Sequence, residues 1–236
     1  MVKKEELMKK IKEKILLRGQ TGVGKTYTAV RLAEFVASRG YKVVYIDPEW
    51  GAERELELLD DEVLENIELR IVPEWKSFKY ECLKNDTCFL KVVDGLSEGF
   101  ELALRFLEER YERLGYYVVQ DKEIQIRDRD SFVLPYMAYP KVYSGVKEIV
   151  HNLVKHSYHI ICTAHPFKET ATQQALEQAI FRKFDTIIDL EKRESMTPPS
   201  IEYVAFLKKH RGKAITSYAM LEDHIGQLKK LFERRM

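Results

Sequence analysis

The sequence has few cysteines and no long apolar run. Its three cysteines, Cys82, Cys88 and Cys162, are odd in number and include no C-x-x-C pair, which argues against a disulfide framework and against a zinc site. No apolar stretch approaches the length of a membrane span, and the charged N-terminus lacks the apolar centre of a signal peptide. These absences predict a cytoplasmic protein that makes no use of a membrane.

The sequence also lacks an excess of charge of either sign. Lysine and arginine number 39 and aspartate and glutamate number 38, which gives a formal net charge of +1. Bulk electrostatics therefore predict no general affinity for nucleic acid or for acidic surfaces, and any contact with DNA has to be local. With 236 residues, 45% of them hydrophobic, the chain can bury a substantial core but is too short for two full α/β domains. We therefore expect one domain over residues 1–236.

A glycine-rich segment stands out against this background. Gly19–Thr26, GQTGVGKT, matches the phosphate-binding loop pattern G-x-x-x-x-G-K-[ST]. A short apolar run precedes it and a segment of helical periodicity, Tyr27–Arg39, follows it, so the strand, turn and helix that the pattern needs are all expected. Glycines allow backbone N–H groups to approach anionic oxygens closely, and the positive end of the following helix points at the same phosphates.

The residues of this loop have distinct expected roles. Lys25 is expected to neutralise charge on the β- and γ-phosphates, and the Thr26 hydroxyl to coordinate Mg²⁺. The whole set of expected nucleotide-binding residues is Gly19, Gln20, Thr21, Gly22, Val23, Gly24, Lys25, Thr26 and Tyr27.

Acidic residues follow the next expected strand. Tyr41–Asp47, YKVVYID, is a nearly continuous apolar run of the kind that central parallel strands show. Ligands of open α/β sheets bind beyond the carboxyl ends of strands, so Asp47 and Glu49 should share an edge with the phosphate-binding loop. Glu49 could polarise a water for in-line attack on the γ-phosphate. Alternatively, Asp47 and Glu49 only cap a helix at Ala52–Leu59.

A later strand also ends in an acid, as in the Walker B pattern. Cys88–Asp94, CFLKVVD, is mostly apolar and is followed by Gly95. A carboxylate at a strand end can reach the cation that bridges the phosphates, directly or through water, so Asp94 is expected to help hold Mg²⁺. The alternative is an ordinary aspartate at a strand-to-turn junction.

Three further side chains are candidates for contact with the phosphates. His165 follows the strand-like run Tyr158–Ala164 and could sense the γ-phosphate through a hydrogen bond, or it could be a structural turn residue. Lys209 and Arg211 are two residues apart, so they should project the same way from an extended segment. They could reach an anion in a neighbouring subunit, or they could face water.

The remaining segments are assigned by pattern. Residues 1–13 are expected to form a leader helix or a solvated arm, and residues 220–236 a basic amphipathic helix. Residues 115–140 mix aromatic and charged side chains and should leave the core as an insertion or mobile loop, in the form of a hairpin. This loop and residues 167–182 could bind single-stranded DNA, or the first could form a subunit contact or a surface flap. Other strands are expected at residues 66–72, 184–190 and 201–207, and helices at residues 96–114 and 141–156.

In their order along the chain, these motifs resemble those of the RecA superfamily. The resemblance is carried by GQTGVGKT, by VVYIDPE ending at Glu49, by LKVVDG around Asp94, by IICTAH ending at His165 and by KKHR with Lys209 and Arg211. It is greatest to the short archaeal and phage RecA-like ATPases, of RadA-like or KaiC-like type. It implies an α/β P-loop NTPase fold with a RecA-like, mostly parallel β-sheet flanked by helices and with an antiparallel C-terminal strand pair.

The resemblance also implies site roles. In that family an acid at the position of Glu49 orients the attacking water, and a polar residue at the position of His165 senses the γ-phosphate. Lys25, Glu49 and His165 are therefore the expected catalytic residues. A K-x-R type pair, here Lys209 and Arg211, acts across a subunit interface on the γ-phosphate, which implies a homo-oligomer.

The resemblance therefore implies a protein that binds and hydrolyses ATP in a Mg²⁺-dependent reaction, with ATP and Mg²⁺ as its cofactors. It implies a role in DNA recombination, annealing or repair. No segment resembles the additional DNA-binding domain of full recombinases, so strand exchange is not implied. One alternative is a KaiC-like or partition-type nucleotide switch in protein assembly, with little turnover. Another is a small-molecule kinase.

Overall fold

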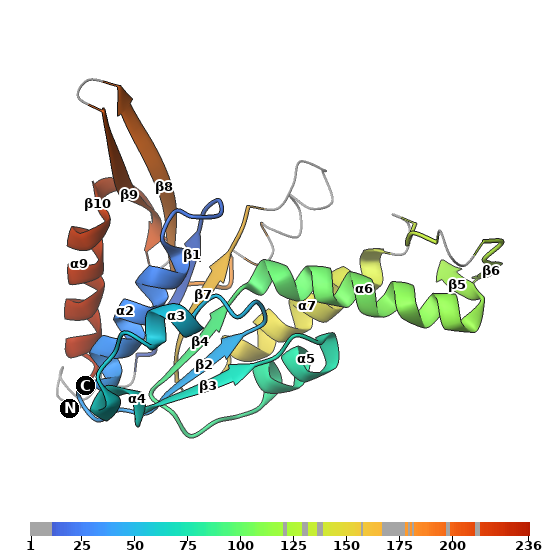
Figure 1. Ribbon diagram of the computed structural model, residues 1–236, viewed down its shortest axis with the longest axis horizontal. Coiled ribbons are helices and arrows are strands. Elements are labelled where there is room, and N and C mark those ends of the chain that lie inside the picture. Colours follow the sequence, from blue (N-terminus) through green and yellow to red (C-terminus); the bar gives the residue numbers. More distant parts are fainter. Residues whose placement is uncertain are drawn as a thin grey trace.

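The protein is an α/β structure built on one large mixed sheet (Figure 1). The computed structural model describes residues 11–119, 122–128, 132–135, 139–156, 158–166, 178, 180, 182–196, 199–210 and 213–236. The sheet has eight strands in the order β10-β9-β8-β1-β7-β4-β2-β3, and a separate hairpin pairs β5 with β6. Within the described residues, no helix combines the length and the apolarity that a membrane crossing requires.

The central strands are parallel. They are β1 (Lys14–Arg18), β2 (Val43–Asp47), β3 (Ile67–Ile71), β4 (Leu90–Asp94) and β7 (His159–Ala164). Their apolar composition fits a sheet that is covered on both faces, because side chains of a strand alternate between the faces. As parallel strands, they bring their carboxyl ends to one rim of the sheet, as the sequence predicts.

Helices cover both faces of the sheet, which gives two cores (Figure 1). On one face, α5 (Trp75–Leu83), α6 (Leu96–Leu114) and α7 (Tyr139–Leu153) pack over Leu16 and its neighbours. On the other face, α2 (Lys25–Ala37) and α9 (Leu221–Glu233) pack over Ile15 and Leu17. The short helices α3 (Glu53–Leu56) and α4 (Asp61–Leu64) lie between β2 and β3 in the chain.

The C-terminal part of the sheet is antiparallel. Strand β8 (Thr186–Met196) runs parallel to β1 and pairs with β9 (Pro199–His210), which in turn pairs with β10 (Lys213–Met220). The predicted antiparallel pair is therefore present, but its strands are longer than expected and a third strand, which the sequence analysis did not predict, follows them. Beyond the sheet, β8 and β9 continue as a projecting hairpin (Figure 1). The exposed part of β8 carries consecutive charged residues and lacks alternating apolar positions, so the sequence did not predict that the strand extends beyond residue 190.

The predicted insertion contains the small hairpin of β5 (Tyr116–Val119) and β6 (Lys122–Gln125). It lies at the far end of α6, away from the main sheet (Figure 1). Of the predicted leader helix, residues 11–13 are described and are not helical, and residues 1–10 lie outside the described residues.

Candidate functional site

A cavity of about 290 Å³ lies at the carboxyl rim of the sheet. Its walls come from the phosphate-binding loop and from the turns after β2, β4 and β7. The expected groups Lys25, Thr26, Glu49, Asp94 and His165 all line it. The full lining is Thr21, Gly22, Gly24, Lys25, Thr26, Tyr27, Asp47, Glu49, Gly51, Glu55, Asp94, Gly95, Glu98, Thr163 and His165.

The glycines of the loop are required by its geometry. Gly22 and Gly24 have φ values of +77° and +92°, a region that favours glycine. A Cβ on Gly19 would lie 2.4 Å from the Leu190 carbonyl oxygen. The loop is also tied to β7, since Gly19 N–H donates to the Ala164 carbonyl oxygen at 3.2 Å.

Lys25 lies inside its own loop. Its Nζ donates hydrogen bonds to the carbonyl oxygens of Gly19 at 2.9 Å and Gln20 at 2.8 Å. Burial lowers the pKa of Lys25, and the nearby carboxylates of Glu98, Asp94 and Glu49 oppose this effect. The cation is thus placed between the loop and a wall of acids, where it can contact an anion that enters the cavity.

Asp94 is held by three hydroxyl groups. Its Oδ1 accepts from Thr163 Oγ1 at 2.6 Å and its Oδ2 from the Tyr45 hydroxyl at 2.8 Å, and Thr26 is a third side-chain partner. Burial raises the pKa of Asp94, and these hydrogen bonds oppose that rise. The structure therefore joins the two predicted magnesium ligands, Thr26 and Asp94. A buried carboxylate and a hydroxyl are oxygen donors of the kind that Mg²⁺ prefers, so this donor set fits the ion.

Two supporting residues of this group were missed by the sequence analysis. Tyr45 comes from β2 and Thr163 from β7, and both lie within apolar strands. The sequence feature that could have identified them is a hydroxyl side chain near the carboxyl end of an otherwise apolar run.

The turn after β2 separates the roles of its two acids. The Asp47 carboxylate accepts from the backbone N–H groups of Glu49 and Ala52, both at 2.8 Å. Asp47 therefore holds the turn that leads to α3, and α3 itself has no side-chain cap. Trp50 has a positive φ of 62°, so this turn holds a non-glycine residue in a left-handed conformation. Such strain is common where a loop positions a functional side chain.

Glu49 faces a second glutamate, Glu98, that was not predicted. Partial burial, together with the carboxylates of Glu98, Asp47 and Asp94, raises the pKa of Glu49 to about 7, and the side chains of Glu49 and Glu98 are hydrogen-bonded. Glu98 belongs to the first turn of α6. The sequence analysis placed it only in the helix expected at residues 96–114, but its position four residues after Asp94 was a usable signal.

His165 lies between Lys25 and Glu98. Its Nδ1 is 3.4 Å from Lys25 Nζ and its Nε2 is 3.3 Å from Glu98 Oε1. A lysine ammonium can only donate, so Nδ1 is the acceptor and Nε2 carries the proton toward Glu98. The backbone N–H of His165 donates to Ser97 Oγ at 2.9 Å, and Ser97 Oγ donates to Glu98 Oε2 at 2.9 Å.

These contacts connect Lys25, His165, Glu98 and Glu49 in one chain of side chains. Ligand atoms of Glu49, Glu98 and His165 lie within 4.8 Å of one another. The side of the cavity formed by the turns after β2 and β7 and by the start of α6 thus carries two carboxylates and an imidazole, which can accept a proton and hold a water.

The predicted cation pair lies elsewhere. Lys209 stands opposite Ile187, near the beginning of β8, so it lies at the rim away from Lys25. Its Nζ donates to the carbonyl oxygens of Phe184 at 2.5 Å and Arg182 at 3.3 Å. Arg211 lies outside the described residues. A contact of this pair with a phosphate in a neighbouring subunit stays a prediction.

The predicted DNA-binding segments are described only in part. Most of residues 167–182, and several residues of 115–140, lie outside the described residues.

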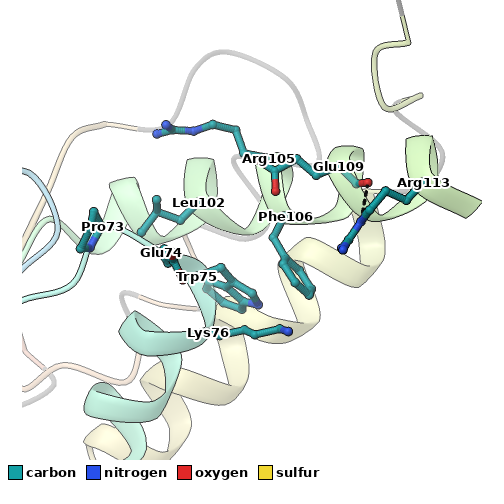
Figure 2. A pocket seen from close by; sticks show the side chains of 9 residues that line it. All are labelled: Pro73, Glu74, Trp75, Lys76, Leu102, Arg105, Phe106, Glu109 and Arg113. Atoms are coloured by element: carbon teal, nitrogen blue, oxygen red, sulfur yellow. Dashed lines mark hydrogen bonds between the residues drawn. The ribbon is translucent and has the colours of Figure 1, made fainter. Parts of the chain in front are cut away.

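A separate cavity of about 300 Å³ lies between α5 and α6, with Trp75, Lys76 and Phe106 among its lining residues (Figure 2). Lys76 Nζ is 5.3 Å from the centre of the Phe106 ring. This cavity contains none of the predicted site residues.

The raised pKa of Glu49 gives a first prediction, for the nucleotide-free protein. Folded Glu49 keeps its proton up to about pH 7, whereas in the unfolded chain its carboxyl group has its ordinary pKa of 4.5. Because the folded state binds more protons between these values, the stability of the wild type relative to Glu49→Gln should fall as the pH rises through this range. Urea unfolding of both proteins at pH 5 and pH 8 measures the difference.

The matched control for this prediction is Glu53→Gln, which changes an exposed glutamate of α3. Its stability relative to the wild type should be nearly the same at both pH values. If the stability of Glu49→Gln relative to the wild type were also the same at pH 5 and pH 8, the raised pKa of Glu49 would be contradicted.

Comparison with known proteins identifies the fold. No protein-family model matches the sequence, and no curated protein is detectably similar to it. Among solved structures, a KaiC-like protein from the hyperthermophilic archaeon Pyrococcus horikoshii is similar with a TM-score of 0.54 and 18% identity, over 86% of this chain and 82% of that chain. The flagellar accessory protein FlaH from Methanocaldococcus jannaschii is similar with a TM-score of 0.53 and 13% identity, over 92% of this chain and 90% of that chain. The predicted RecA-like fold is confirmed.

Proposed function

We propose that this protein is a Mg²⁺-dependent ATPase that binds ATP at Gly19–Tyr27 and hydrolyses it at the rim of the sheet. The observation that carries the proposal is the meeting of Lys25, the joined pair of Thr26 and Asp94, and the cluster around Glu49 in one cavity. These groups match the needs of phosphoryl transfer, which are charge neutralisation and placement of a nucleophile.

The phosphate-binding part requires little rearrangement. The backbone N–H groups at the start of α2 and the Lys25 ammonium supply the positive potential for a triphosphate. Thr26 and Asp94 would hold Mg²⁺. When bound, this ion would neutralise negative charge on the phosphates. On nucleotide binding, Lys25 exchanges its bonds with the loop carbonyls for bonds with the phosphates.

The hydrolytic part is assigned to Glu49. Its carboxylate positions the attacking water and accepts its proton. The pKa of about 7 suits a general base near neutral pH. Glu98 positions Glu49 by the hydrogen bond between their side chains, and it also orients His165. His165, next to Lys25, can then report the presence of the γ-phosphate through its ring.

The role of Glu98 gives a second prediction. Glu98→Gln removes a negative charge beside Glu49, so the pKa of Glu49 should fall and the acidic limb of the pH profile of kcat should move to lower pH. The loss of positioning should lower kcat at pH 8 by about tenfold. Steady-state turnover between pH 5 and pH 9 tests both effects.

Glu101→Gln is the control, because it changes an exposed glutamate of the same helix. A Glu98→Gln protein with reduced kcat and an unmoved acidic limb would limit Glu98 to a structural role.

The resemblance of the motifs to recombination-associated ATPases supports an action in DNA recombination, annealing or repair by a homo-oligomer. Single-stranded DNA should then stimulate ATP turnover, and an ATP analogue with DNA should increase the molecular mass in solution.

The alternative is a nucleotide switch in protein assembly, supported by the likeness of the fold to a KaiC-like protein and to a flagellar accessory protein. Slow turnover that is equal with and without DNA would favour the switch.

A further inference from the structure

We propose that a second cavity, beside the phosphate-binding loop, binds the purine base of the nucleotide and that Glu222 recognises an exocyclic amino group on it. The cavity has a volume of about 550 Å³. Its lining is Gly22, Gly24, Tyr27, Ile201, Glu202, Tyr203, Met220, Leu221 and Glu222. This inference rests on the proposed function. It adds a site for the base of the nucleotide, which the phosphate site does not recognise.

The two cavities are neighbours. Gly22, Gly24 and Tyr27 line both of them. In the proposed complex the γ-phosphate points toward Glu49 and Asp94, so the α-phosphate and the ribose must leave the loop on the other side. That side is formed by Tyr27 and by the C-terminal residues of this chain. A nucleotide with its phosphates in the first cavity therefore has its base near the second.

The walls of the second cavity suit a flat aromatic ring. Ile201, Tyr203 and Met220 are 55%, 39% and 42% exposed, although large apolar side chains are usually withdrawn from water. They come from β9 and from the end of β10, and the start of α9 completes the wall. An apolar hollow with a few polar groups is the usual form of a small-molecule site, and a base can stack on a tyrosine ring.

One polar side-chain contact lies at this wall. The Tyr27 hydroxyl donates to Glu222 Oε1 at 2.9 Å, and the Arg31 guanidinium lies 5.2 Å from the centre of the Tyr27 ring. Within the described residues, Glu222 Oε2 accepts no hydrogen bond. An ionised carboxylate only accepts, so it favours an N–H donor on the base and disfavours a carbonyl oxygen at the same place. The base that fits is one with an exocyclic amino group, and the ATP of the proposed function makes it a purine.

Binding measurements with three ligands can separate the base from the phosphates. Calorimetry with ATP, with inorganic tripolyphosphate and with purine riboside triphosphate, which lacks the 6-amino group, is carried out on the wild type and on two variants. Tyr203→Ala should weaken ATP binding about tenfold through lost stacking, with tripolyphosphate binding unchanged. Tyr80→Ala, at a tyrosine of α5 that is 64% exposed, is the control and should alter neither affinity.

The second variant tests recognition of the amino group. The wild type should bind ATP about fivefold more tightly than purine riboside triphosphate, and Glu222→Ala should remove this preference by weakening ATP alone. The pair GTP and ITP, which differ by the 2-amino group, distinguishes guanine from adenine as the preferred base. A Glu222-dependent preference within either pair supports the inference and identifies the base.

The results that would overturn the inference differ from those that would overturn the proposed function. If wild type binds ATP and tripolyphosphate equally and Tyr203→Ala changes nothing, the cavity does not hold the base and the phosphate site stands. An accompanying loss of oligomer mass in Tyr203→Ala would then assign the cavity to a second copy of this chain. If neither ATP nor tripolyphosphate binds the wild type, the proposed function itself fails.

Discussion

Glu49→Gln is expected to lower ATP turnover about 10³-fold while leaving the affinity for ATP nearly unchanged. Removal of a general base typically costs 10²- to 10⁴-fold. Glutamine keeps the size of the side chain, but it cannot accept the proton of the attacking water. In the proposed complex Lys25 and the backbone of the loop bind the phosphates, so the variant should still hold ATP. Phosphate release at saturating nucleotide and calorimetric ATP affinity are the two measurements.

Glu53→Gln serves as the matched control for this variant too, because its glutamate lies on α3, shortly after Glu49, and points to solvent. Its turnover should equal that of the wild type. If Glu49→Gln retained full turnover, another group would have to activate the water, and Glu98 would be the first to examine. Equal losses in both variants would instead indicate a general disturbance of this turn.

Lys25→Met is expected to weaken ATP binding at least about 100-fold. Hydrogen bonds between charged groups contribute more than neutral ones, and a buried cation facing a polyphosphate is only weakly screened. The variant also removes a cation that interacts with the carboxylates of Glu98, Asp94 and Glu49, so bound phosphates would face more negative charge. Calorimetry with ATP and with tripolyphosphate should show similar losses, because in the proposed complex Lys25 contacts only the phosphates.

Lys122→Met, in the exposed hairpin of β5 and β6, is the control for removal of one positive charge. Its ATP affinity should match the wild type. An unchanged affinity in Lys25→Met would mean that the phosphates bind elsewhere in the protein.

The fold and the central part of the site could be predicted because their signals are local. GQTGVGKT combines the loop, its lysine and its hydroxyl in one octapeptide, and Asp94 follows directly from an apolar strand. Once the strands are taken as parallel, the position of their carboxyl ends on one rim follows from the geometry of a sheet. Glu49, Asp94 and His165 could therefore be placed near Lys25 without knowledge of the tertiary contacts.

The unpredicted parts depend on contacts between distant segments. Glu98 has the pattern of a solvated helix residue, and only the packing of α6 against the rim brings it to Glu49 and His165. The second cavity combines Tyr27 with Tyr203 and Glu222, which lie 176 and 195 positions later in the sequence. Strand β10 was not predicted; it pairs with β9, which extends to His210, beyond the strand expected at residues 201–207.

Single-turnover hydrolysis of γ-labelled ATP tests the central claim most directly. Excess protein is mixed with ATP and Mg²⁺, and bound nucleotide and released phosphate are followed together for the wild type and Glu49→Gln. We predict that both proteins bind the nucleotide and that only the wild type releases phosphate at an appreciable rate. Release at the same rate from both proteins, or no binding by either, would contradict the account.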